Sequence, residues 1–370
     1  MTSASTASES VPGGPPPPVP PPPRPTVRPW AFVAVLATLA FIVGASTFTI
    51  PYYAIAPGSA VAVAPLVKVV DGPSHPPEGQ VFLCTVSLRR TTLLQALEGW
   101  LDPTVDVVRE RVLKPPDVSA EEYRQLNLQA MDTSKEQAMG VAFEQLGYDA
   151  ITGNGAQIVQ IVEGSPADGP LELGEVIVAV DGNRVELHTE AVIALGEHEP
   201  DDDVTLTVEG DDGREREVDV RLGVHPADDE RPFLGVTLRT REPRFDFPFE
   251  VQIASDRIGG PSAGLAFTLQ VLDVLTEGEL TGGRKVAATG TMELDGTVGQ
   301  VGGVAQKTVA VEEAGVELFL VPEGELAEAR KHAGKNVRVE AVGSLEDALR
   351  ILSTFGGNGL ALERPGAAGA

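Results

Sequence analysis

The longest uninterrupted apolar stretch of the chain lies near its N-terminus. Residues 30–50 carry no charge, aromatic residues flank them, and Pro51 follows. As a helix rising about 1.5 Å per residue, this stretch would be roughly 30 Å long, which matches the hydrocarbon core of a bilayer. The pattern predicts a single transmembrane helix over residues 30–50.

Basic residues flank this stretch mainly on its N-terminal side. Arg24 and Arg28 precede it, whereas the first basic residue after it is Lys68. By the positive-inside rule, the N-terminus is predicted to be cytoplasmic and the bulk of the chain extracytoplasmic. A cleaved signal peptide is the alternative, because residues 54–56 imitate a processing site, but the apolar run is longer than usual for such a peptide.

The segments between the ends of the chain differ in their patterning. Residues 51–137 alternate strand-like and helix-like stretches without readable chemistry, and we interpret them as a juxtamembrane α/β region. Residues 155–223 alternate short β-branched stretches with Gly, Pro and Asp turns, interrupted by one helix-like stretch. This pattern is typical of a small β-rich module.

Composition excludes several classes of protein. The chain has 54 acidic and 28 basic residues, a net charge of −26, which disfavours nucleic-acid binding. The single cysteine, Cys84, cannot form an internal disulfide, and the five histidines are scattered, so no metal site is predicted. Residues 1–29 are proline-rich and residues 356–370 are rich in Gly and Ala, so both are predicted to be flexible.

The β-rich module resembles a bacterial PDZ domain over roughly residues 138–223. The matching core motifs are Gly164-Ser165-Pro166-Ala167, Leu173-Gly174-Glu175-Val176-Ile177 and Val180-Asp181-Gly182. In such domains a peptide adds a strand to an open sheet edge, and backbone N–H groups of an apolar-Gly-apolar loop hold its C-terminal carboxylate. The resemblance assigns this loop to Leu146, Gly147 and Tyr148, and the other groove wall to residues 189–196. The alternative is that Leu146 and Tyr148 pack while Gly147 makes a turn.

A glycine-rich segment before a helix-like pattern contains the first candidate for catalysis. Residues 259–264 read Gly-Gly-Pro-Ser-Ala-Gly, and leucines at 265, 269, 272 and 275 follow with helical spacing. Ser262 is thereby predicted at a helix N-terminus, where unpaired N–H groups can stabilise an oxyanion. The helix pattern alone favours an N-cap role for this serine.

A second glycine pair precedes another helix-like stretch. Predicted strands over residues 286–301 lead to Gly302-Gly303, and Lys307 lies near the start of the helix that follows. A cation is disfavoured there, and apolar neighbours would lower the lysine pKa further. A lysine that is neutral near pH 7 can take the proton of a serine hydroxyl. No histidine lies between His225 and His332, so a local Ser-His pair is not favoured.

These segments resemble the proteolytic domain of Lon-type serine proteases. The matching residues are Gly260-Pro261-Ser262-Ala263-Gly264, Thr289-Gly290, and Gly302-Gly303 with Lys307. The resemblance implies that Ser262 is the nucleophile, Lys307 the general base, and Thr289 a hydrogen-bond partner that orients the lysine. It places Gly260 and Ala263 in the oxyanion region beside the nucleophile.

The full order of segments resembles the membrane-anchored, PDZ-containing Lon-like proteases of bacteria. It implies an α+β fold with one N-terminal transmembrane helix, a β-rich PDZ domain, and a C-terminal Lon-type α+β proteolytic domain over residues 224–355. The implied protein is an ATP-independent serine endopeptidase of the bacterial cell membrane that cleaves unfolded or tail-exposed envelope proteins presented by its PDZ domain. No cofactor is implied, the partners are polypeptide substrates, and homo-oligomerisation is left open.

Two segments depart from energy-dependent relatives. Gly259 and Gly260 stand where such members usually carry an acidic residue before the Gly-Pro-Ser step. Residues 278–285 have a loose GxxxxG spacing but lack the Lys-Ser/Thr pair of a phosphate-binding loop, so no ATPase module is indicated. A catalytically silent PDZ scaffold or adaptor is the alternative function, against which the presence of both Ser262 and Lys307 argues.

Overall fold

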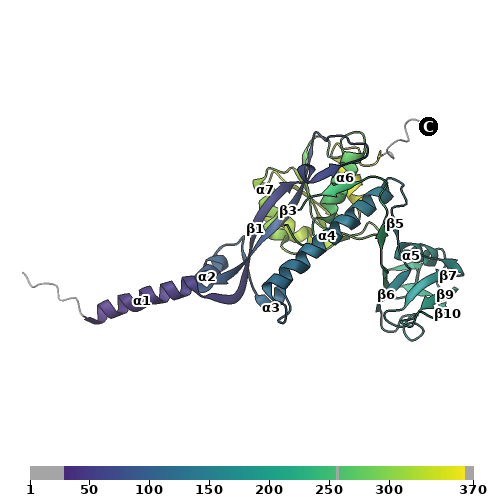
Figure 1. Cartoon of the computed structure of the whole chain (residues 1–370), viewed down its shortest axis with the longest axis horizontal. Coiled ribbons are helices and arrows are strands. Elements are labelled where there is room, and N and C mark those ends of the chain that lie inside the picture. Colours follow the sequence, from purple (N-terminus) through teal and green to yellow (C-terminus); the bar gives the residue numbers. More distant parts are fainter. Residues whose placement is uncertain (1–28, 256–257, 363–370) are drawn as a thin grey trace, which may run out of the picture.

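The computed structural model describes residues 29–255 and 258–362. It shows an elongated molecule in which one helix projects from an α/β body and a small β domain lies at the opposite end (Figure 1). The predicted flexible arm, apart from Pro29, and the last eight residues of the predicted tail lie outside the described residues.

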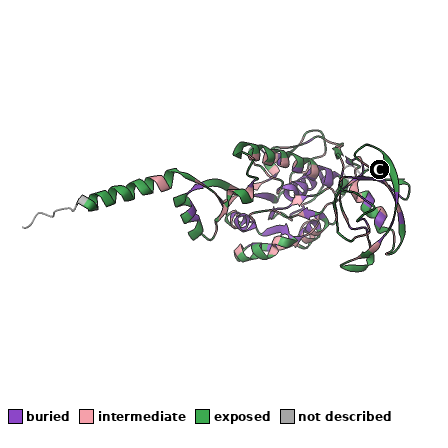
Figure 2. Cartoon of the chain, turned by 90° about the horizontal axis from the view of Figure 1, so that it is seen from below, coloured by how far each residue is buried: buried purple, intermediate pink, exposed green. Residues whose placement is uncertain are grey.

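The apolar N-terminal stretch forms helix α1 (Pro29–Thr47), whose described side chains are exposed for most of its length (Figure 2). The helix ends before the predicted boundary at residue 50, because Thr49 and Ile50 already belong to strand β1 (Thr49–Ala62). No helix in the described part of the chain is long and apolar enough to cross a bilayer. The structure therefore does not support the predicted transmembrane helix.

A mixed sheet forms the centre of the body. Its strands lie in the order β20-β19-β16-β3-β1-β4. Their bounds are β20 (Arg338–Val342), β19 (Leu318–Pro322), β16 (Lys285–Ala288), β3 (Gln80–Thr92) and β4 (Asp106–Arg109), together with β1. Neighbours from β20 to β3 are parallel, whereas β1 is antiparallel to both β3 and β4.

This sheet joins two segments that the sequence pattern separates. Strands β1, β3 and β4 come from the predicted juxtamembrane region, residues 51–137, and β16, β19 and β20 come from the predicted proteolytic domain. The contact between them is the β3–β16 ladder, in which Val81 pairs with Val286 and Leu83 with Ala288. The two segments are therefore one domain in the structure, with the β module inserted between them. Periodicity cannot reveal this pairing, because the partners lie about two hundred residues apart.

Alternation along the strands buries both faces of the sheet. Val81 and Leu83 of β3 belong to a core that also includes residues of α4 (Ala120–Gln145), α6 (Gly264–Leu275) and α9 (Leu345–Thr354). Phe82 and Cys84 face the other way, into a core shared with α7 (Val304–Glu313) and α8 (Leu326–His332). The body is thus a three-layer helix, sheet, helix arrangement.

The inserted β module has its own core and its own sheet. The strand order is β10-β9-β7-β6-β13, so β13 lies at an edge. The bounds are β10 (Glu215–Arg221), β9 (Asp203–Glu209), β7 (Val176–Val180), β6 (Ala156–Ile161) and β13 (Val236–Thr240), and α5 (His188–Gly196) packs on this sheet. The core includes Ile158, Ile177 and Leu206, which are almost completely buried.

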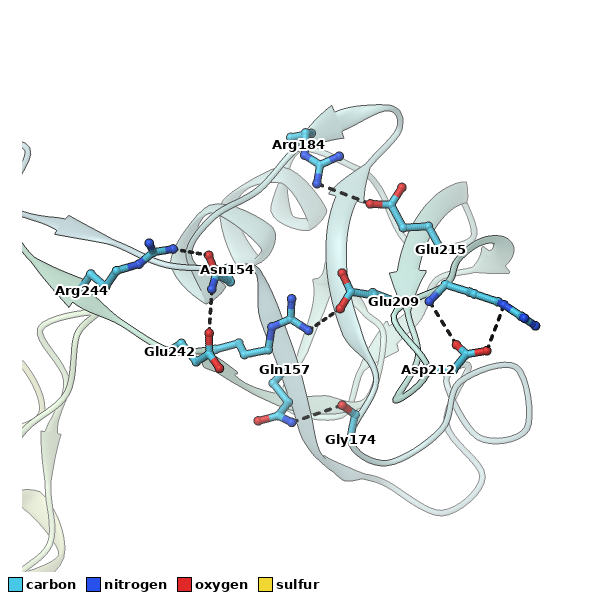
Figure 3. A network of polar contacts seen from close by, with 11 residues as sticks. Asn154, Gln157, Gly174, Arg184, Glu209, Asp212, Glu215, Glu242 and Arg244 are labelled. Carbon is cyan, nitrogen blue, oxygen red and sulfur yellow. Dashed lines mark hydrogen bonds and ion pairs between the residues drawn. The ribbon is translucent and has the colours of Figure 1, made fainter.

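A short strand pair links the module to the body. Strand β5 (Ile151–Thr152) pairs with β14 (Arg244–Phe245). Beside it, the amide of Asn154 donates to Glu242 at 2.8 Å, and Arg244 donates to the carbonyl oxygen of the same amide (Figure 3). Both entry and exit of the insertion are therefore fixed by the same polar contacts.

The remaining elements are short. They are η1 (Ala64–Leu66), β2 (Val67–Val69), α2 (Leu93–Leu101), α3 (Glu110–Leu113), β8 (Asn183–Arg184), β11 (Gly223–His225), β12 (Asp228–Phe233), β15 (Val251–Ile253), β17 (Thr291–Met292), β18 (Val298–Gly299) and η2 (Glu323–Glu325).

Candidate active site

Ser262 lies in a tight loop immediately before α6. The helix begins at Gly264 and its N-cap is Ala263, which makes no side-chain capping bond. Ser262 is therefore outside the helix and half-buried, and it is not the N-cap that the helix pattern alone favours. The Ser262 hydroxyl therefore does not cap α6.

Two glycines allow this loop to form. Gly260 has φ of 93°, in the left-handed region that disfavours residues with a Cβ. At Gly264, an added Cβ would come within 2.6 Å of the backbone nitrogen of Met292 in β17. The loop therefore lies directly against the hairpin formed by β17 and β18.

Helix α4 supports the loop from the other side. The backbone N–H of Gly260 donates to the carbonyl of Asn127 at 2.7 Å. The hydroxyl of Ser134, which is 2% exposed, donates to the carbonyl of Pro261 at 3.0 Å. Neither Asn127 nor Ser134 stands out in the sequence, because their spacing within a long amphipathic helix gives no indication of a distant partner.

Thr289 connects the serine loop to Lys307. Its hydroxyl donates to the backbone carbonyl of Ser262 at 3.2 Å, and it accepts a hydrogen bond from Lys307 Nζ at 2.9 Å. The backbone N–H of Gly290 also donates to the Ser262 carbonyl, at 3.0 Å. The structure thus places Thr289 between the backbone carbonyl of Ser262 and Lys307 Nζ.

Lys307 lies in the first turns of α7 and is almost completely buried, with 2% of its surface exposed. Desolvation by burial lowers the pKa of its ammonium group from 10.5 to about 8. Charge interactions with Cys84 and Glu325 oppose this lowering only in part. Within residues 29–255 and 258–362, Thr289 is the only hydrogen-bond partner of Nζ. A substantial fraction of this lysine is therefore neutral at slightly alkaline pH.

Cys84 faces Lys307 from strand β3. Burial raises the pKa of its thiol to about 12, so the side chain stays protonated at physiological pH. A protonated, buried thiol is neither a nucleophile nor a metal ligand. The cysteine is therefore part of the apolar wall around the lysine, in agreement with the packing role that its sequence context favours.

The backbone around Ser262 contains a candidate oxyanion site. Among the residues that the structure describes, the N–H groups of Ser262 and Ala263 donate to no protein atom. The N–H of Gly260 is already used by Asn127, so it is not available as a donor. Of the two residues predicted for the oxyanion region, Ala263 has a backbone N–H without a protein acceptor among the described residues, whereas Gly260 shapes the loop.

The residues predicted as the peptide carboxylate loop lie in the body and not in the inserted β module. Leu146 is 4% exposed and belongs to the core between the central sheet, α4 and α6, and Tyr148 packs against that core. The ring of Tyr148 lies edge-on to Phe143 and Phe249, with centroids 5.9 and 5.7 Å apart. Gly147 has φ of 78° and ends α4 in a turn. The structure therefore contradicts the predicted loop and shows the packing role that was the alternative.

A different apolar-Gly-apolar loop precedes the edge strand of the module. Leu234 and Val236 flank Gly235, which has φ of 85°, and β13 begins at Val236. Within the described residues, the N–H groups of Leu234 and Gly235 donate to no protein atom. Since β13 has an open edge and α5 packs beside it, this loop and strand have the geometry for binding a peptide C-terminus. The sequence pattern of residues 233–238 could have revealed it, but the predicted domain ended before it.

A contact connects α5 to the hairpin formed by β17 and β18. His188, the first residue of α5, has Nε2 3.9 Å from a carboxylate oxygen of Asp295, in the turn between β17 and β18. The other ring nitrogen lies 2.8 Å from the hydroxyl of Thr240 at the end of β13. The side-chain interaction with His188 is the main cause that lowers the pKa of Asp295 to about 2. The pair therefore joins both groove walls to the hairpin that follows Thr289.

The described residues contain no metal-binding cluster. No three His, Cys, Asp or Glu side chains come close enough together in this part of the chain to hold an ion.

Family models match both domains. A model of the PDZ domain matches residues 137–222, and a model of the Lon protease (S16) C-terminal proteolytic domain matches residues 254–354. The second match contains Ser262, Thr289 and Lys307. The fold is thus of mixed α+β type with a PDZ domain and a Lon-type proteolytic domain.

Curated Lon proteases are also similar to parts of the chain. The chain is 26% identical over 214 residues to the Lon protease of Haemophilus influenzae, which covers 56% of this chain and 24% of that protein. It is 34% identical over 100 residues to the Lon protease of Geobacter metallireducens, covering 26% of this chain and 12% of that protein. The chain therefore spans at most 24% of the length of these relatives.

Solved structures of PDZ domains are similar to part of the chain. The PDZ domain of an SdrC-like protein from Listeria monocytogenes is 21% identical, with a TM-score of 0.21, and the match covers 23% of this chain and 87% of that one. The corresponding domain from Listeria innocua is 20% identical with the same TM-score, and the match covers 23% of this chain and 92% of that one.

Proposed function

We propose that this chain, a PDZ-containing Lon-like protease by its two matched domains, is a serine endopeptidase in which Ser262 is the nucleophile and Lys307 the general base. The observation that carries the proposal is the burial of Lys307 beside Thr289, which in turn holds the Ser262 loop. An exposed lysine would keep its proton at neutral pH, whereas a buried one can release it. A Ser-Lys pair then needs no histidine.

The proposed reaction proceeds in two halves. Neutral Lys307 takes the hydroxyl proton as Ser262 Oγ bonds to the substrate carbonyl carbon, and the free N–H of Ala263 donates to the oxyanion. The protonated lysine then gives its proton to the departing amine, which leaves an acyl ester on Ser262. In the second half, Lys307 takes a proton from water, which attacks the ester, and returns it to Ser262.

Thr289 has a positioning role in this scheme. Its hydroxyl hydrogen is used by the Ser262 carbonyl, so a lone pair of its oxygen faces Lys307 Nζ. The threonine therefore fixes the lysine without competing for the proton that the base must receive. A valine at this position should leave the fold intact and lower kcat more than it changes KM.

The PDZ domain is proposed to bind the substrate. The open edge of β13 can pair with an extended chain, and the free N–H groups of Leu234 and Gly235 can hold its C-terminal carboxylate. Without an ATP-driven unfoldase, the enzyme would depend on unfolded proteins or exposed tails, because a stable fold does not offer extended chain. Peptide hydrolysis should therefore proceed without nucleotide.

The test of the proposed chemistry is turnover of an unstructured protein and of a short fluorogenic peptide by the purified chain. Ser262→Ala should abolish hydrolysis while its unfolding midpoint stays near wild type. Lys307→Arg should also abolish hydrolysis, because the guanidinium of arginine keeps its proton. Its unfolding midpoint should fall, because the larger side chain stays charged in the buried site. Ser59→Ala, on an exposed part of β1, is the matched control and should cleave normally. Hydrolysis by Ser262→Ala at the wild-type rate would refute the nucleophile. Peptide binding without any hydrolysis by wild type would favour the silent scaffold.

Attachment to the bacterial cell membrane through α1 is a separate proposal. The helix is uncharged, and Phe32, Leu39 and Phe41 are among its side chains that are more than half exposed. Burial in lipid would remove this apolar surface from water. With the basic residues on its N-terminal side, the chain beyond α1 is proposed to be extracytoplasmic. Protease added to intact spheroplasts should then digest the PDZ and proteolytic domains, and their protection until lysis would refute the orientation.

A further inference from the structure

Helix α2 presents an apolar face that the rest of the described chain does not cover. Five of its nine residues are large, hydrophobic and more than one-third exposed: Leu93 (44%), Leu94 (37%), Leu97 (51%), Trp100 (58%) and Leu101 (79%). At 100° per residue, these positions fall within roughly 120° of the helix circumference. The exposure is therefore a continuous stripe and not a set of scattered side chains.

The opposite face of α2 is fixed to the body. Ala96 is fully buried, and a Cβ at Gly99 would come within 2.7 Å of Val107 in β4. Thr92 and Gln95 form a capping box at the N-terminus of the helix. The close packing at Ala96 and Gly99 and the capping box at the N-terminus hold α2 in one orientation. Its leucines therefore remain exposed in the folded protein.

The stripe lies where α1 meets the body. We name residues 48–62 and 86–114 the finger, because they form the extension of the central sheet from which α1 projects (Figure 1). Helices α1 and α2 contact each other, and the ring of Trp100 lies edge-on to Tyr52, with centroids 6.3 Å apart. Exposed apolar side chains of α1 and α2 thus lie on two helices that contact each other.

The finger also differs in charge from the rest of the molecule. It has five basic and four acidic residues, a net charge of +1, so the remaining residues carry −27. The basic residues are Arg89, Arg90, Arg109, Arg111 and Lys114. A bilayer surface with anionic lipid repels the acidic body but not this part. Tryptophan and arginine beside a leucine stripe are also the residues that favour the headgroup region.

We propose that α2 lies in the headgroup region of a phospholipid bilayer, with Leu97, Trp100 and Leu101 directed into the lipid. The inference rests on the membrane attachment proposed above and extends it from one helix to a two-point contact. A helix anchor alone lets the body rotate about a single linkage. A second contact, fixed to the central sheet through Gly99, holds the body in one orientation relative to the membrane.

The chain allows a direct test, because Trp30 and Trp100 are its two tryptophans. The full-length Trp30→Phe variant, inserted in vesicles of phosphatidylcholine and phosphatidylglycerol, reports on Trp100 alone. Its fluorescence should be quenched by lipids brominated near the headgroup, more weakly by lipids brominated at the chain end, and little by aqueous acrylamide. The Trp100→Phe variant reports on Trp30 and so on α1 itself.

A pair of variants on α2 separates lipid contact from a structural effect. Leu97→Gln with Leu101→Gln, in the Trp30→Phe background, should abolish most of the lipid quenching and shift the emission to longer wavelength, while the far-UV spectrum and peptide turnover stay unchanged. Glu98→Gln, on the polar side of the helix, is the matched control and should keep the quenching.

The outcomes are distinct. Trp100 quenched by acrylamide but not by lipid would overturn the inference and leave a solvent-facing helix. Trp100 shielded from both quenchers would also overturn it and indicate a protein partner, such as a second copy of this chain. If Trp30 is quenched by lipid and Trp100 is not, the anchor stands and the second contact fails. If neither is quenched, the membrane attachment itself fails, whereas the protease assay with Ser262→Ala is unaffected by any of these results.

Discussion

The depressed pKa of Lys307 makes a quantitative prediction about activity. With a pKa of about 8 in the free enzyme, the neutral fraction of this lysine is about 1% at pH 6 and about 90% at pH 9. If Lys307 is the general base, kcat/KM should rise roughly tenfold per pH unit below 8 and level off above it. Cys84 does not titrate in this range, since burial raises its thiol pKa to about 12.

The same burial predicts a cost in stability. Lowering the pKa from 10.5 to about 8 corresponds to about 3 kcal/mol at pH 7, at about 1.4 kcal/mol per pKa unit. The unfolded chain keeps this proton at a pH where the folded chain has lost it, so stability rises with pH between about 8 and 10.5. Lys307→Met removes the buried charge but leaves Thr289 without its donor, which costs about 1 kcal/mol. The variant should therefore be about 2 kcal/mol more stable than wild type at pH 7.

Urea unfolding at pH 7 and pH 10, together with pH profiles of peptide hydrolysis, checks both statements. The stability advantage of Lys307→Met should shrink at pH 10, where the wild-type lysine is neutral in the folded state, and the variant should be inactive at every pH. Lys285→Met, which removes an exposed lysine at the start of β16, is the matched control and should change neither property. A flat activity profile from pH 6 to pH 9, or a destabilised Lys307→Met at pH 7, would refute the reasoning.

Three further predictions follow from the contacts around the site. A substrate tail with a free, apolar C-terminus should have a KM about 10- to 100-fold lower than the same tail with a C-terminal amide. The amide loses the charge-assisted hydrogen bonds to the N–H groups of Leu234 and Gly235. Equal KM values would show that this loop does not bind the substrate carboxylate. Asp295→Asn should weaken the protection of the β17–β18 hairpin against hydrogen exchange at pH 6. His188 lowers the pKa of the Asp295 carboxyl to about 2. The difference between variant and wild type should therefore diminish as the pH falls below 4 and the wild-type carboxyl becomes protonated. Gly264→Ala should cost roughly 1–3 kcal/mol in urea unfolding and slow turnover of short and long substrates alike, since its methyl group meets the backbone of Met292; wild-type stability and turnover would show that the contact is not tight.

The sequence by itself indicated the candidate site more fully than the architecture. Ser262 and Lys307 were predicted as a pair because each follows glycines near the start of an apolar helix and because these motifs resemble those of Lon-type proteases. Both helices form close to where the local pattern predicts them, although Ser262 lies just outside the first. The β-rich character of the inserted module was also readable, since strands with buried alternate residues and glycine turns are short-range features. The acidic composition and the single cysteine excluded whole classes of site for the same reason.

The tertiary structure decided what depends on distant partners. Pairing of β3 with β16 made one domain from two predicted regions, and no periodicity encodes which strands become neighbours. Leu146 and Tyr148 fit the carboxylate-loop pattern, yet Leu146 is buried in the core of the proteolytic domain and Tyr148 packs against Phe143 there. The matching loop at Gly235 lies beyond the predicted domain. The hydrogen bonds of Asn127 and Ser134 in α4 to the serine loop could not be predicted from the sequence either. A residue's type fixes what it can do chemically, but burial and contacts between distant segments fix whether it is placed to do it.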